Sequence, residues 1–361
     1  KFGKASEEVC ADFTKAERLV ALNSPAMQIA MYTAMIIVSY VGAKLIINSG
    51  GSTMGVGALS SMFTYGMQIL SSLMMLSMIF VMITISNASI QRICEVLNEE
   101  STIENPENPK TSVPNGSIDF NGVSFKYHAG AEKYALTDID LHIKSGETIG
   151  IIGGTGSSKS SLIQLISRLY DATEGEVLVG GSNVKDYDIE TLRNAVSVVL
   201  QKNVLFSGTI KENLRWGDMN ATDEELVRVC KLAQADEFIN TLPDGYDTHI
   251  EQGGTNVSGG QKQRLCIARA LLKKPKIIIF DDSTSAVDTK TDALIRKALA
   301  TEIPDTTKII IAQRISSVQE ADRIVVMEDG RINAVGTHEE LLNSNDIYKE
   351  VYYSQNKAGE E

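Results

Sequence analysis

Charged residues are nearly absent from one long part of this sequence. Between Ser24 and Gln91 the only Asp, Glu, Lys or Arg is Lys44, whereas the remainder is rich in all four. This contrast separates a membrane part from a soluble part, and 361 residues provide enough chain for about two domains. The sequence also lacks an excess of positive charge, because its net charge is −12. Binding to a nucleic-acid backbone needs a clustered basic surface, so we exclude nucleic acid as the main partner.

Cysteine is scarce as well. The four cysteines, Cys10, Cys94, Cys230 and Cys266, include no C-x-x-C pair. We therefore expect free, buried thiols in a reducing compartment.

Two long apolar runs make up the uncharged part. They cover 26–47 and 56–85, and the first already has the roughly 20 residues that cross a hydrocarbon core. Turn-forming residues 48–55 join them, so the runs predict a transmembrane hairpin. Lys15 and Arg18 before it and Arg92 after it place both ends in the cytoplasm. Residues 1–23 predict a helix in water, and no cleaved signal sequence is evident.

Two features of the hairpin have alternative explanations. Ten of the twelve methionines lie before residue 83, where they either line a permissive substrate cavity or fill gaps between helices. Lys44 is either a substrate-binding or gating charge, or a lysine that reaches the outer interface; its position near the end of the run favours the latter.

A glycine- and serine-rich loop organises the soluble part. The stretch 149–170, IGIIGGTGSSKSSLIQLISRLY, places an apolar run before the loop and a helical pattern after it. Such a loop aims backbone N–H groups at phosphates, Lys159 reaches the β- and γ-phosphates, and the Ser160 hydroxyl holds Mg²⁺. The pattern G-x-x-x-x-G-K-[ST] expects glycine where Ser158 stands, and its Cβ could crowd the phosphates. The alternative is a glycine-rich turn that binds nothing.

The region before the loop contains a linker and two strands. Residues 99–116 hold three prolines and no apolar periodicity, which predicts a linker. The strands that follow read SIDFNGVSFKYH and ALTDIDLHI. Tyr127, at the end of the first, could stack on an adenine ring, and Tyr134 is a competing candidate.

Four further segments carry polar residues at strand or helix ends. Gln201 ends the apolar run AVSVVL, and its amide could reach Mg²⁺ or its water. VSGGQ at 257–261 opens a long helix, where Ser258 could cap the helix and donate to a phosphate; the alternative is only a well-capped helix. Asp281 ends the buried strand KIIIF, where parallel sheets bind ligands, and is the expected Mg²⁺ partner. Gln313 follows the later strand KIII.

The loop, Gln201, VSGGQ, the Asp281–Asp282 pair and SAVD at 285–288 occur in an order that closely resembles the nucleotide-binding domain of ABC transporters. The resemblance covers residues 117–361, and VSGGQ before a helix is its most specific part. It implies an α/β P-loop ATPase with a helical subdomain, fused C-terminal to the last two helices of an exporter-type membrane domain at 1–98. Such exporters have six membrane helices per half, so we expect this sequence to be part of a longer or split protein.

The resemblance also implies the cofactors ATP and Mg²⁺ and a head-to-tail pair of ATPase domains. Tyr127 would stack on adenine, and Ser160, Gln201 and Asp281 would contact Mg²⁺. The phosphates would lie on Gly153, Gly154, Thr155, Gly156, Ser157, Ser158, Lys159, Ser160 and Ser161. The partner's ATP would contact Ser258, Gly259, Gly260 and Gln261, and the subunits would meet at Ser285, Ala286, Val287 and Asp288.

Two positions depart from the family pattern. Asp282 stands where the family has its catalytic glutamate; its carboxylate is one methylene short, and a misplacement of about 1 Å can cost on the order of 100-fold in rate. Gln313 stands where the family has a switch histidine, and an amide carries no positive charge. The histidines at 128, 142, 249 and 338 lie in other segments. Together the departures predict a degenerate site.

We therefore expect an ABC-type ATPase, weak at its own site, in one half of a heterodimeric exporter. It would be an integral membrane protein of a bacterial plasma membrane with a cytoplasmic ATPase domain. Its partners would be a second half-transporter, membrane lipid, and a small-molecule, lipid or peptide substrate. The alternatives are a homodimeric exporter with weak ATPase activity, an ATP-gated regulatory subunit, and a soluble ATPase of the same fold; the apolar hairpin and the acidic charge argue against the last.

Overall fold

A computed structural model describes residues 2–128, 130–282 and 287–357 of the chain. It divides into two compact units, Lys1–Ser101 and Thr102–Glu361.

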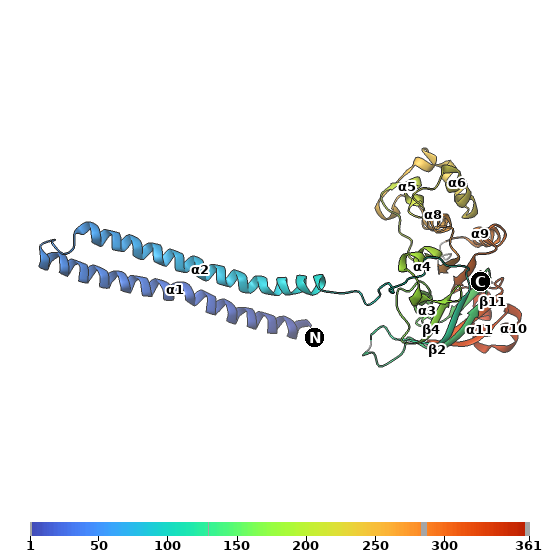
Figure 1. Cartoon of the computed structure of the whole chain (residues 1–361), viewed down its shortest axis with the longest axis horizontal. Coiled ribbons are helices and arrows are strands. Elements are labelled where there is room, and N and C mark those ends of the chain that lie inside the picture. Colours follow the sequence, from blue (N-terminus) through green and yellow to red (C-terminus); the bar gives the residue numbers. More distant parts are fainter. Residues whose placement is uncertain (1, 129, 283–286, 358–361) are drawn as a thin grey trace. The chain divides into compact units, whose positions relative to one another are not determined.

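The first unit is a pair of long helices, α1 (Phe2–Ser49) and α2 (Val56–Leu97), which run side by side in opposite directions (Figure 1). Both are long and apolar enough to cross a membrane. They approach closely at Gly42, where a Cβ would lie 2.5 Å from Leu59 Cδ1. Farther along the pair, the Asn23 amide donates to the Ser77 hydroxyl at 2.6 Å. The predicted hairpin is therefore present as a packed pair.

The helix predicted over 1–23 and the first apolar run are one element rather than two. Helix α1 passes through Pro25. Proline keeps a helical φ and removes one N–H donor, so a long helix with packing beyond that point can tolerate it. Cys230 and Cys266 are buried as expected, whereas Cys10 on α1 and Cys94 on α2 are exposed.

The second unit is built on a six-stranded sheet in the order β12-β11-β3-β10-β9-β6. Five neighbouring strands are parallel, and β12 is antiparallel to β11. A four-stranded antiparallel sheet has the order β2-β1-β4-β5, and β7 pairs with β8. The strands are β1 (Ile118–Phe125), β2 (Leu136–Ile143), β3 (Thr148–Gly153), β4 (Glu174–Val179), β5 (Ser182–Asn183), β6 (Val196–Val199), β7 (Gly208–Thr209), β8 (His249–Ile250), β9 (Ile277–Asp281), β10 (Thr307–Ile311), β11 (Arg323–Glu328) and β12 (Arg331–Gly336).

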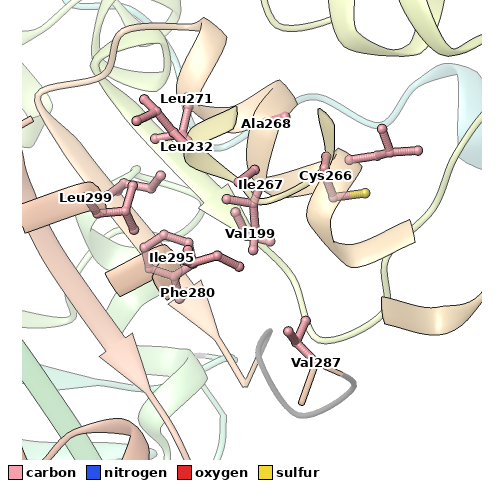
Figure 2. Packing of buried hydrophobic residues seen from close by; sticks show 14 of the residues in the cluster. Val199, Leu232, Cys266, Ile267, Ala268, Leu271, Phe280, Val287, Ile295 and Leu299 are labelled. Carbon is pink, nitrogen blue, oxygen red and sulfur yellow. The ribbon is translucent and has the colours of Figure 1, made fainter. Parts of the chain in front are cut away.

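The unbroken apolar runs of the parallel strands face two separate cores. In β9, Ile277 and Ile279 lie in the core with β1, β2 and α3, whereas Ile278 and Phe280 lie in the other core. Strands with both faces buried need no polar alternation, which explains why the sequence reads IIIF. Figure 2 shows the second core, where Phe280 packs near Val199, Ile267 and Ile295.

Helices cover the sheet and form a separate group at one end of the unit. Helices α5, α6 and α8 gather there (Figure 1), and α8 packs on both others. This group is the predicted helical subdomain. The helices are α3 (Lys159–Ile166), α4 (Ile189–Ala195), α5 (Ile210–Arg215), α6 (Asp223–Leu232), α7 (Asp236–Thr241), α8 (Gly259–Leu272), α9 (Thr289–Glu302), α10 (His338–Ser344) and α11 (Asp346–Lys357), with short 3₁₀ turns η1 (Val184–Asp186), η2 (Gly245–Asp247), η3 (Gln252–Gly254) and η4 (Ile315–Ser317).

Most of the segment that we expected to be a linker belongs to the second unit. The Asn105 amide donates to Asp188 Oδ1 and its oxygen accepts from Ile189 N–H, both at 2.8 Å. Lys110 exchanges backbone hydrogen bonds with Asp186 and Asp188, and the Gly116 carbonyl accepts from the Thr307 hydroxyl at 2.6 Å. Backbone pairing of this kind is compatible with the prolines in the segment, which is why composition alone did not reveal it.

Candidate functional site

The predicted polar residues come together because four parallel strands end at one edge of the sheet. Strand β10 lies between β3 and β9, and β6 follows β9. Ile311 pairs in register with Ile151 of β3 and with Asp281 of β9. The loop after β3, the carboxylates after β9 and the segments after β10 and β6 therefore share this edge, where open parallel sheets bind ligands.

The glycine- and serine-rich loop wraps around the ammonium group of its own lysine. Lys159 Nζ donates to the carbonyls of Gly153 and Gly154, both at 2.8 Å, and to the Ser157 hydroxyl at 3.1 Å. Burial lowers the pKa of Lys159, while Asp281 and Asp282 oppose that change. A Cβ at Gly153 would lie 2.3 Å from the Met327 carbonyl oxygen, so only glycine fits there. The cation is thus held at the mouth of a loop that leads into a helix, as an anion site requires.

From the sequence we expected that the Ser158 Cβ could crowd the phosphates. The structure instead shows an unusual backbone conformation at this residue. Its φ is 67° and its ψ is 25°, which is the left-handed region, and it precedes the first residue of α3. A residue with a Cβ costs roughly 1–2 kcal/mol in this region. The missing glycine therefore leaves a strained backbone position next to Lys159.

Ser160 and Asp281 provide oxygen atoms suited to a hard cation. The Ser160 hydroxyl lies 3.2 Å from Asp281 Oδ2 and 3.4 Å from Oδ1. Burial raises the pKa of Asp281, and the nearby Asp282 carboxylate adds to that, whereas the Ser160 hydroxyl opposes it. Within the described ranges, no group of three His, Cys, Asp or Glu residues could hold a metal alone. A hydroxyl and one carboxylate fit Mg²⁺, which takes the rest of its ligands from water and phosphate.

Asp282 is held by two glutamine amides. Gln201 Nε2 donates to Asp282 Oδ2 at 3.0 Å, and Gln313 Nε2 donates to the same oxygen at 2.9 Å. The structure thus brings Gln201, expected as a Mg²⁺ contact, to Asp282 rather than to Asp281. The φ of Asp282 is 47°, again in the left-handed region.

The structure separates the two tyrosine candidates. The Tyr127 hydroxyl lies 2.7 Å from the Ser161 hydroxyl on α3, so its ring stands beside the loop. The Tyr134 hydroxyl instead donates to Glu174, the first residue of β4, at 2.6 Å. Tyr170, which we did not predict, meets the Tyr127 ring edge-on at 5.1 Å between centroids. Its place after the loop helix gave no periodic signal, since only folding brings it back to Tyr127.

The VSGGQ segment forms a complete helix cap. The Ser258 hydroxyl accepts from Gln261 N–H at 3.2 Å, and the Gln261 side-chain oxygen accepts from Ser258 N–H at 2.9 Å. Gly259 and Gly260 form the first turn of α8 between them. Ser258 and Gly259 are exposed, so the positive end of this helix faces outward from the chain.

The SAVD segment is described only in its second half, because Ser285 and Ala286 lie outside the described residues. Val287 is buried in the core shown in Figure 2. Asp288 caps α9 by accepting from Thr291 N–H at 3.0 Å. This hydrogen bond lowers the pKa of the Asp288 carboxyl. The two described residues thus anchor the end of the segment to the domain.

The chain is similar in sequence to known ABC transporter proteins. Residues 136–285 match the family described as ABC transporter. An ABC transporter ATP-binding protein of Bacillus subtilis is 40% identical over 355 residues, covering 98% of this chain and 61% of that protein. One of Mycobacterium tuberculosis is 39% identical over 360 residues, with the same 98% and 61% coverage. The chain thus spans about three fifths of these relatives.

A solved structure has a similar fold. A bacterial Atm1-family ABC exporter with ATP bound is 31% identical, with a TM-score of 0.79 over 95% of this chain and 60% of that one. ABC ATPase domains bind ATP together with Mg²⁺. The loop around Lys159 and the Ser160–Asp281 pair are suited to both. The second unit, which contains the matched residues 136–285, therefore has the fold of an ABC-type ATPase domain, and two helices long enough and apolar enough to cross a membrane precede it in this chain.

Proposed function

We propose that this chain is part of the ATP-binding and permease subunit of a heterodimeric ABC exporter, and that its own ATP site hydrolyses slowly. ATP binding and hydrolysis between two ATPase domains would drive export of a small molecule, lipid or peptide. The two apolar helices would belong to the membrane domain, with the ATPase domain in the cytoplasm. The bacterial relatives favour a bacterial plasma membrane.

The positions of these residues support a role for each in binding ATP or Mg²⁺. The loop residues 153–161 would hold the phosphates, with Lys159 turning from the carbonyls of Gly153 and Gly154 to the β- and γ-phosphates. Ser160 and Asp281 would hold Mg²⁺, with Gln201 near them. Tyr127 would stack on adenine, because its ring stands beside α3. ATP supplies the phosphoanhydride bond whose hydrolysis powers transport.

The observation that carries the slow-hydrolysis proposal is the environment of Asp282. Its Oδ2 accepts from both Gln201 and Gln313. That oxygen is therefore already engaged by two donors when water would have to approach it. The aspartate is also one methylene shorter than glutamate, and Gln313 cannot carry the positive charge of an imidazolium. Each of these differences acts against activation of the attacking water.

The exposed signature segment supports the proposal of a partner. Ser258, Gly259, Gly260 and Gln261 form a helix N-terminus that is exposed at its first residues and favours a phosphate. This chain would use it to complete the ATP site of a second, unlike half-transporter. The residues 285–288 would contribute to the contact between the two ATPase domains.

The double substitution Asp282→Glu with Gln313→His tests the slow site. We expect ATPase activity of the two-chain complex, with the partner's own ATP site inactivated, to rise by roughly tenfold to 100-fold, because the longer carboxylate reaches the water and the imidazole replaces a neutral amide. Asp282→Asn is the matched control and should show no rise. Fast hydrolysis by the unaltered chain without a partner would overturn the proposal and favour a homodimeric exporter.

The ATP-gated regulatory subunit remains the second candidate function, since an amide-held Asp282 suits nucleotide binding without hydrolysis. Lys159→Ala distinguishes the two in vesicles that contain both halves. Loss of substrate movement supports the transport role. Unchanged transport with altered regulation supports the regulatory role.

A further inference from the structure

The C-terminal helix α11 reaches the segment that carries Gln313. The side-chain oxygen of Gln355 accepts from Ile315 N–H at 2.9 Å, and its side-chain nitrogen donates to the Gln313 carbonyl at 2.7 Å. One side-chain amide thus pairs with the backbone on both sides of Arg314, which is itself extended with φ −95° and ψ 128°. Just after β10 ends, this side chain thus makes the hydrogen bonds that the backbone of a neighbouring strand would make inside the sheet.

The helix is fixed firmly enough to transmit this contact. Tyr348 is fully buried in the same core as Ile315 and Val318, and Val351 and Tyr352 pack against that core. Residues 348, 351, 352 and 355 follow helical spacing and share one face. Gln355 is therefore an exposed polar residue at the end of an apolar stripe, and its side-chain amide contacts the backbone of 313–315.

The side chain of Gln313 contacts Asp282, and its backbone carbonyl contacts Gln355. Its amide nitrogen lies 2.9 Å from Asp282 Oδ2, while its carbonyl accepts from Gln355. Three side-chain torsions lie between the backbone of Gln313 and its amide plane, so the backbone at 312–315 sets the point from which that amide reaches Asp282. We propose that Gln355 is a positioning residue that aims Gln313 at the terminal phosphate of bound ATP. This rests on the proposed ATP site and adds the C-terminal helix to it.

The test compares the affinities of the full chain for ATP and ADP, each with Mg²⁺, by calorimetry in detergent. Gln313→Ala should reduce the preference for ATP over ADP by roughly tenfold, the loss of one hydrogen bond to a charged group. Gln355→Ala should reduce it by several-fold. In the Gln313→Ala background, Gln355→Ala should add nothing, because both changes remove the same contact. Ser354→Ala, an exposed neighbour on α11, is the matched control.

A merely structural role would lower the melting temperature and weaken ATP and ADP binding equally, leaving the preference unchanged. That result, or an undiminished effect of Gln355→Ala in the Gln313→Ala background, would overturn the proposal. Gln355→Glu keeps the acceptor for Ile315 N–H and loses the donor to Gln313, so it should give an intermediate preference. Gln355→Glu also tests the proposal if Gln355→Ala does not fold.

Two measurements distinguish failure of the Gln355 proposal from failure of the proposed ATP site. Lys159→Ala should abolish ATP binding whatever Gln355 does, and unchanged ATP binding there would refute the proposed function. Hydrogen exchange at the Ile315 amide needs no nucleotide and should accelerate in Gln355→Ala, since that amide loses its acceptor. An unchanged exchange rate would refute the backbone contact.

Discussion

Ser158 adopts a backbone conformation that suits glycine. The hydroxyl gives no helix-capping hydrogen bond, and the left-handed φ of 67° places the strain in the main chain. Ser158 thus contributes strain but no compensating cap, directly before the lysine that would bind phosphate.

Ser158→Gly should change stability little and improve nucleotide binding. Relief of the left-handed strain should raise the free energy of unfolding by roughly 1–2 kcal/mol. The greater freedom of glycine in the unfolded chain should lower it by about 0.5–1 kcal/mol. We expect a net gain of between about 0 and 1.5 kcal/mol in unfolding free energy, together with tighter ATP binding, because the loop can adjust to the phosphates. Ser158→Val should do the reverse, since β-branched residues disfavour this region. Denaturant unfolding and ATP titration measure both, and weaker ATP binding by Ser158→Gly would contradict the argument.

At the scale of elements, an ion pair joins the starts of β3 and β11. Glu147 Oε1 accepts from Arg323 Nε at 2.6 Å and Oε2 accepts from Arg323 Nη2 at 2.9 Å. Burial alone would raise the pKa of Glu147, but the hydrogen bonds from Arg323 and from the Lys144 N–H outweigh it and lower the pKa. The neighbouring strands that place the loop at the sheet edge are thus tied at their opposite ends.

Glu147→Gln should destabilise the ATPase unit by about 1–3 kcal/mol at neutral pH, the usual range for a hydrogen bond to a charged group. The carboxyl has a lower pKa in the folded than in the unfolded chain, so its stabilisation is complete above its ordinary pKa of 4.5. It is lost as the pH falls through the folded pKa. Melting curves of both forms should therefore converge in acid. Glu302→Gln, an exposed carboxylate on α9, is the control, and a constant gap at all pH values would contradict the ion-pair explanation.

At the scale of the whole molecule, the phosphate loop and the signature helix belong to different parts of the ATPase unit. The loop lies at the sheet edge, and α8 begins in the helical group at one end (Figure 1). The exposed start of α8 is consequently free to complete a site on another chain. This is why we propose a partner rather than a self-contained enzyme.

Ser258→Asp should block the partner's site while leaving this chain's own ATP binding intact. Aspartate caps a helix as well as serine does, so α8 should remain folded, but its charge would repel the partner's phosphates. We expect ATP turnover by the two-chain complex to fall by at least about tenfold, given a repulsion of several kcal/mol. Ser258→Asn has the same shape without the charge and should retain most activity. Equal loss in both variants would point to damaged folding instead.

Residue order and periodicity alone determined several features of this protein. The loop at 149–170, the buried strands IIIF and III, the capped helix after VSGGQ and the apolar pair at 26–47 and 56–85 are local patterns. Local patterns fix local structure, because they depend on backbone sterics, capping and burial within a short stretch. The fold class followed from the resemblance of these motifs, in this order, to the ATPase domain of ABC transporters.

Only the tertiary structure decided how distant residues meet. The two amides on Asp282, Tyr170 against Tyr127 and Gln355 on the backbone at 313–315 join segments far apart in the chain. The strain at Ser158 likewise depends on how the loop closes onto α3. Sequence spacing carries no record of such contacts, since they arise from the order of strands in the sheet and from which helix packs on which core. The parallel sheet brings four strand ends to one edge, and that convergence turns separate polar residues into a site.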